Sequence, residues 1–150
     1  MTPPQGIGRE AGNEREHEGL HTPRWPISNH LLRKKNMQLD TYQTRATATA
    51  FYPGHEDSSS IEGLSYVTMG LVGEAGEIAN KVKKIIRDNG GVIDGITRTQ
   101  VLAELGDVLW YVALIAEQLG YPLHLVAAWN LQKLADRAER GVLEGSGDDR

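Results

Sequence analysis

From residue 37 onward, apolar residues recur every three or four positions, which is the spacing of the buried face of an α-helix. The clearest example lies within residues 70–88, where this spacing links Leu71, Ala75, Ile78 and Val82. The sequence shows no sustained alternation of apolar and polar residues, the pattern that a half-buried β-strand requires. The pattern therefore predicts an all-α fold.

Four helices are expected along this pattern, and they cover about residues 37–51, 59–88, 97–119 and 122–140. The motifs Ser59-x-x-Glu62 and Thr97-x-x-Gln100 fit the capping box that begins a helix. Gly120 suits the left-handed position that follows a helix, and Pro122 suits the first turn of the next one. The glycines at 90 and 91 predict the turn between the second and third helices.

Residues 1–36 differ in kind from the rest of the chain. They are rich in proline, glycine, glutamate and arginine and have no sustained periodicity, which is typical of a disordered segment. We therefore divide the chain into an N-terminal arm at residues 1–36 and one helical domain at residues 37–150.

Composition narrows the class of protein. The net charge is −4, from 16 basic and 20 acidic residues, so the chain lacks the basic surface typical of proteins that bind duplex nucleic acid. The sequence has no cysteine, which excludes disulfides and thiolate metal sites. No uninterrupted apolar run reaches the ~18 residues of a membrane span, and the N-terminus lacks the apolar stretch of a signal peptide. A cytoplasmic protein without a membrane partner is expected.

The third expected helix is unusual because residues 107–116 are apolar on nearly every side. Such a helix is normally buried on more than one side. It is either the central core helix or part of an interface between subunits. Because a chain of about 110 ordered residues offers little to cover it, we favour the interface.

Two pairs of acidic residues occupy matching positions in the second and third helices. Glu74 and Glu77 are followed 30 residues later by Glu104 and Asp107, and the apolar residues around them match as well. At about 100° per residue, each pair lies at the border of its helix's apolar face. If the chain reverses at the glycines midway between the pairs, the helices pack antiparallel and the four carboxylates come level.

Two interpretations of these acids are available. Carboxylates about 4 Å apart repel by about 4 kcal/mol at an effective dielectric constant near 20, so a cluster needs raised pKa values or a cation. An all-oxygen set favours Mg²⁺ or Mn²⁺. The alternative is a solvated helix face with pairs such as Glu77–Lys81. Glu104 and Asp107 are the only charged residues within 99–116, and polar groups in so apolar a helix need partners. A metal site is therefore predicted.

Further polar residues stand at positions that suit a ligand with phosphate groups. Singly, each is more readily explained as a surface residue; as a set, they would suit a polyphosphate near the metal. Tyr111, four residues after Asp107, either donates a hydrogen bond or stacks on a base, or else packs in the core. The candidate substrate-binding residues are Lys81, Lys84, Tyr111, Asn130, Lys133 and Arg137.

The segments "GLVGEAGEIANKVKK", "ELGDVLWYVA" and "NLQKLADR" carry these residues. In them the chain resembles the MazG-like, all-α nucleoside triphosphate pyrophosphohydrolases, and the resemblance covers about residues 37–150. The signature of that family is Glu-x-x-Glu, a variable spacer and Glu-x-x-Asp, and here the spacer covers residues 78–103. The resemblance implies a four-helix MazG-like bundle that assembles as a homodimer or homotetramer.

The resemblance also implies an activity. It implies Mg²⁺-dependent hydrolysis, with Mn²⁺ as a substitute, of a nucleoside triphosphate to the monophosphate and pyrophosphate, in a role such as nucleotide-pool clearance. Carried over by position, the metal ligands are Glu74, Glu77, Glu104 and Asp107. Glu74 and Glu77 are the expected catalytic residues, and Glu77 is either a ligand or the general base. Two other classes remain: a non-catalytic nucleotide- or protein-binding helical module, and a structural helical oligomer.

Overall fold

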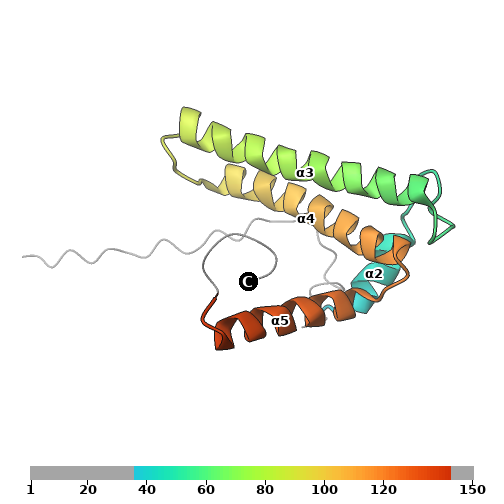
Figure 1. Ribbon diagram of the computed structural model, residues 1–150. Coiled ribbons are helices and arrows are strands. Elements are labelled where there is room, and N and C mark those ends of the chain that lie inside the picture. The colour runs from blue at the N-terminus through green and yellow to red at the C-terminus, as the bar shows by residue number, and fades with distance from the viewer. Residues whose placement is uncertain (1–35, 143–150) are drawn as a thin grey trace, which may run out of the picture.

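The computed structural model describes residues 36–142, which form four α-helices. They are α2 (Leu39–Thr47), α3 (Ile61–Asp88), α4 (Gly95–Gln118) and α5 (Leu123–Glu139) (Figure 1). No strand occurs among these residues, so the all-α prediction is confirmed. All but the last residue of the predicted arm lies outside the described part of the chain, and its disorder stays a prediction.

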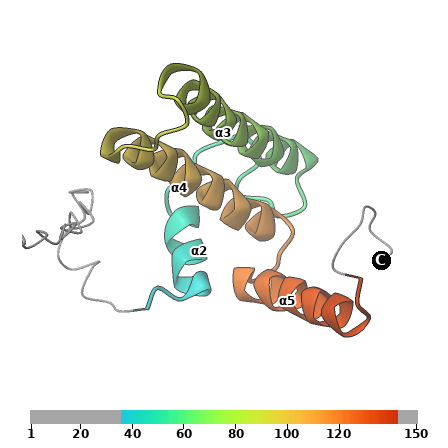
Figure 2. The same ribbon diagram turned by 90° about the vertical axis from the view of Figure 1, so that its left-hand side faces the viewer.

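Helices α3 and α4 form a long antiparallel hairpin, and both views show them side by side (Figures 1 and 2). Gly90 and Gly91 have φ angles of +58° and +82°, which side chains with a Cβ rarely adopt. The N–H of Gly91 donates to the carbonyl oxygen of Ile85 at 3.0 Å and closes the end of α3. The predicted reversal at the two glycines is therefore confirmed.

The core of the hairpin lies toward the end opposite this turn. Val67 on α3 and Leu114 on α4 are fully buried there, and Tyr52 from the preceding loop packs against them. A second cluster lies on the other side of α4, where Ala46 of α2 packs on Ala113. Helix α4 is thus buried on two sides near its C-terminal end, which agrees with the alternative of a core helix, and the subunit interface that we favoured stays a prediction.

Helix α5 is held mainly by its first turn. The side-chain oxygen of Gln43 on α2 accepts from the N–H of Leu123 at 2.6 Å, and Asp40 accepts from the N–H of His124 at 3.3 Å. These bonds satisfy N–H groups that the start of a helix leaves unpaired. Among the four described helices α5 packs on α2 and α4 but not on α3, and Figure 2 shows it leading away from the hairpin.

Several predicted helix limits need correction. Helix α3 is capped by Ser60, whose hydroxyl accepts from the N–H of Gly63, because the hydroxyl of Ser59 donates to Asp57 instead. Helix α4 begins at Gly95 rather than near Thr97, because the Asp94 carboxylate accepts from the Thr97 N–H at 2.7 Å. Pro122 directly precedes α5 instead of lying in its first turn. The first helix, α2, spans Leu39–Thr47 and is therefore shorter than the predicted range 37–51. The expected end of α4 before Gly120 is confirmed.

Helix α4 is long and apolar enough to cross a membrane by length and composition alone. The same properties are found in the core helix of a soluble protein, and this helix packs on α2, α3 and α5. Glu104 and Asp107 also lie within it. The expectation of no membrane partner stays a prediction.

Candidate metal and nucleotide site

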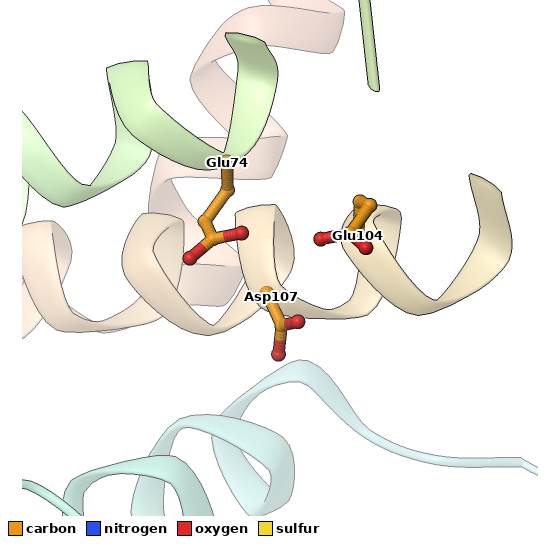
Figure 3. Close-up of side chains that lie close together, drawn as sticks. All are labelled: Glu74, Glu104 and Asp107. Atoms are coloured by element: carbon orange, nitrogen blue, oxygen red, sulfur yellow. The ribbon is translucent and has the colours of Figure 1, made fainter. Parts of the chain in front are cut away.

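Three of the four predicted acids, contributed by the two long helices, come close together. Glu74 comes from α3, and Glu104 and Asp107 come from α4 (Figure 3). One carboxylate oxygen from each lies within 4.8 Å of the others. Glu74 and Glu104 are half-buried, and Asp107 is exposed. We call these three residues the acid trio.

Two features of the sequence position the trio. They are the spacing of its residues along α4 and a glycine that lets α3 approach α4 closely. Residues three apart on α4 project from the same side, so Glu104 and Asp107 both reach toward one region. One turn before Glu74, Gly70 faces the ring of Tyr111, and a Cβ at this position would overlap that ring. The glycine therefore lets α3 approach α4 closely beside the trio.

The three carboxylates of the trio repel one another. Partial burial raises the pKa of Glu74 above its ordinary value, and the negative charges of Asp107, Glu104 and Glu77 raise it further. Carboxylates at this separation repel each other unless a proton or a cation lies among them. The arrangement therefore favours binding of positive charge.

One positive charge is supplied by the chain itself. The ammonium of Lys81 on α3 lies 3.0 Å from Oε1 of Glu104 on α4. The two side chains are only 24% and 19% exposed, so water screens this pair less than a surface pair. The partner of Lys81 is thus Glu104, across the helix interface, and not Glu77 on its own helix.

Two other predicted residues of α3 lie outside the trio. Glu77 is exposed, and its oxygens are not among those that meet in the trio. Lys84 is also exposed, and together with Lys81 it lines a cavity of about 330 Å³ that extends toward the hairpin turn. Because Lys81 belongs both to this cavity and to the ion pair with Glu104, the cavity adjoins the trio. We call it the lysine cavity.

Tyr111 packs in the core, which is one of the two roles that its position suggested. Its ring packs against Gly70 and makes an edge-on contact with Trp110, with ring centroids 4.9 Å apart. Burial raises the pKa of its hydroxyl, and Tyr66, Glu74 and Asp107 raise it further. Core packing is therefore shown, while the contact with a nucleotide stays a prediction.

Helix α5 carries three of the predicted substrate-binding residues. Asn130 and Lys133 are exposed, and within the described residues no hydrogen bond or ion pair links either of them to an acid of the trio. Arg137 is half-buried on the same helix. Phosphate or sugar binding by these three residues stays a prediction.

Tyr42 is a residue near the site that the sequence did not indicate. Burial raises the pKa of its hydroxyl, and the negative charge of Asp107 raises it further, which places α2 beside the trio. Figure 3 shows the Asp107 side chain directed toward α2. The spacing of residues within α2 gives no sign of this, because it depends on how α2 packs on α4.

Comparisons with known proteins bear on the family to which the chain belongs. A family model, the MazG nucleotide pyrophosphohydrolase domain, matches residues 63–142, which include all four predicted acids. The chain is also 62% identical over 114 residues to the Gene 37 protein of Mycobacterium phage L5, a match that covers 76% of this chain and all of that protein. No solved structure matches the chain. The family match covers more than half of the sequence and confirms the resemblance: the chain belongs to the MazG nucleotide pyrophosphohydrolase domain family.

Proposed function

We propose that this protein is a Mg²⁺-dependent nucleoside triphosphate pyrophosphohydrolase that converts a ribo- or deoxyribonucleoside triphosphate and water into the monophosphate and pyrophosphate. The observation that carries the proposal is the acid trio, formed by two helices of a chain that belongs to the MazG family. The name of the phage relative gives no activity, so the support comes from the family and the site.

The chemistry of the trio fits a hard divalent cation. Its donors are carboxylate oxygens from Glu74, Glu104 and Asp107, with no sulfur or imidazole. Mg²⁺ prefers oxygen ligands and is usually held by a few carboxylates together with the phosphates of a substrate; Mn²⁺ accepts the same ligands. A cation bound to the trio would neutralise part of the negative charge on the phosphates.

Glu77 and the two lysines of the lysine cavity suit the other parts of the proposed reaction, which are proton transfer and phosphate binding. Glu77 is exposed one turn from Glu74 and is suited to accept a proton from the attacking water. As the water oxygen bonds to the phosphorus of the α- or β-phosphate, that proton passes to Glu77, the phosphorus–oxygen bond between these two phosphates breaks, and the monophosphate and pyrophosphate separate. Lys81 and Lys84 line the lysine cavity and are suited to hold the phosphate chain.

Two acidic residues, Asp88 and Asp94, also line the lysine cavity, but both already have partners within the protein. Asp88 is paired with Arg87 at 2.6 Å, and Asp94 accepts two hydrogen bonds from Thr97 at the start of α4. Because both carboxylates already have partners, they compete less for the lysines; Lys81 itself is paired with Glu104, while Lys84 is exposed.

We further propose that the protein acts as a homodimer or homotetramer. A shallow groove on α3 is lined mainly by Ala75, Ile78, Val82 and Ile86, and Val72 beside it is 68% exposed. Exposed apolar residues also occur on α4 and α5 and include Leu102, Leu105, Trp129 and Leu131. Monomers rarely expose apolar surface this extensively, so a second copy of the chain is the expected cover.

The activity is tested with a panel of normal and modified nucleoside triphosphates and Mg²⁺. Monophosphate and pyrophosphate in equal amounts are expected, with loss of product when the metal is chelated. Thermal stabilisation by nucleotide without turnover would instead indicate a binding module. Absence of stabilisation by either Mg²⁺ or nucleotide would indicate a purely structural role.

A further inference from the structure

The ion pair between Lys81 and Glu104 occupies the place where the proposed cation would bind. It is the only ion pair that joins α3 to α4 among the residues that the structure describes. The next lysine on α3, Lys83, donates to Asn80 on its own helix at 3.0 Å, and Lys84 lines the lysine cavity. Of the three lysines on α3, Lys81 is therefore the one that pairs with an acid of the trio.

A lysine ammonium and a divalent cation at the same carboxylate repel each other. Both would lie within a few ångströms of Glu104, in surroundings that are only about one-fifth exposed, where screening by water is weak. Lysine is a compact charge on a flexible four-carbon stem, so its ammonium can move without a change in the helix. The lysine cavity, which Lys81 already lines, gives it somewhere to go.

We propose that Lys81 is an internal competitor for the metal at Glu104, and that binding of the cation transfers the Lys81 ammonium into the lysine cavity, where it meets the phosphates of the substrate. This inference rests on the proposed function, because it assumes that the trio holds the metal. It adds that Lys81 lowers the affinity for metal alone and couples metal binding to phosphate binding. Such coupling is reciprocal: phosphate binding that draws Lys81 away also strengthens metal binding.

The test measures binding of Mn²⁺ alone to the full-length protein by calorimetry or by electron paramagnetic resonance. In Lys81→Met the Kd for Mn²⁺ is expected to fall about tenfold, because one cation that competes at Glu104 is gone. The matched control is Lys84→Met, which removes the same charge one turn away and should change the Kd by about twofold at most. Lys81→Arg keeps the charge and should remain close to the wild type.

Thermal unfolding supplies a second readout that does not depend on activity. With a chelator present, Lys81→Met should melt below the wild type, because the trio loses its counter-ion, and Mn²⁺ should raise its melting temperature by more than it raises that of the wild type. If Lys81→Met folds poorly, Lys81→Gln replaces it in both measurements.

Two results would overturn the inference: an unchanged or weaker Mn²⁺ affinity in Lys81→Met, or an equal gain in Lys84→Met, which would indicate only a general effect of charge. Either can occur while the wild type still releases pyrophosphate, so failure here is distinguishable from failure of the proposed function.

Discussion

The α3–α4 hairpin and helix α5 are built on different principles. The hairpin packs along two long helices, closes with a two-glycine turn and brings three acids together. Helix α5 is anchored by hydrogen bonds at its first turn, and farther along it Trp129 and Leu131 remain 56% and 66% exposed. The difference is consistent with our proposals that the acid trio of the hairpin carries the chemistry and that a second copy of the chain covers the exposed apolar residues of α5.

The largest effect is expected from removal of a trio carboxylate. Glu74→Gln or Asp107→Asn should lower Mg²⁺-dependent pyrophosphate release by about 100-fold or more, since each removes an oxygen ligand and its charge. Glu139→Gln at the end of α5 makes the same chemical change outside the hairpin and should leave the rate unchanged. Circular dichroism checks that all three variants fold. Full activity in a trio variant would refute the assignment of the site.

The close approach of α3 to α4 gives the next largest effect. Gly70→Ala places a methyl group against the Tyr111 ring and should destabilise the protein by about 1–3 kcal/mol through overpacking. Gly73→Ala, three residues along the same helix, meets no atom within 4 Å and should stabilise by up to about 1 kcal/mol through helix propensity. Urea unfolding of the pair measures the difference. Equal effects would mean that the contact at Gly70 does not set the spacing of the helices.

The hairpin could be predicted from the sequence because its determinants are local. The apolar period gives each helix, the two glycines give the reversal, and the offset of 30 residues then brings Glu74, Glu104 and Asp107 level. The exact caps were missed where two candidates compete within a few residues, as Ser59 and Ser60 do beside Asp57.

The placement of α2 and α5 could not be predicted in this way. It depends on contacts between residues far apart in the chain, such as Gln43 with Leu123 and Trp110 with Thr49. No periodicity encodes these pairs, so the position of Tyr42 beside Asp107 was missed as well. Likewise, helical spacing offered Lys81 a partner on its own helix, while the structure pairs it across the interface with Glu104.

A smaller, local effect is expected from Gln43, which anchors α5. Its amide donates to Glu117 at 2.9 Å and to the Tyr121 carbonyl at 3.0 Å, and its oxygen accepts from Leu123. Gln43→Ala should cost about 1–2 kcal/mol, because these groups lose their partners. Hydrogen exchange should show faster exchange in α5 than in the middle of α3 and α4. Uniform acceleration along the chain would mean that α5 is not a separate unit.

The smallest effect is the pH dependence of stability that Glu74 causes in the hairpin. Because its pKa is raised above the ordinary value of 4.5, its carboxylate is less favourable in the folded than in the unfolded chain. The folded state therefore loses stability as the pH rises from about 4.5 through the raised pKa, and at lower pH both states carry the proton.

With a chelator present, Glu74→Gln should melt above the wild type at neutral pH and converge with it toward pH 4. Added Mg²⁺ should narrow the gap at neutral pH, since the cation relieves the same repulsion that the substitution removes. A gap of constant size across this range would place its cause in packing and not in charge.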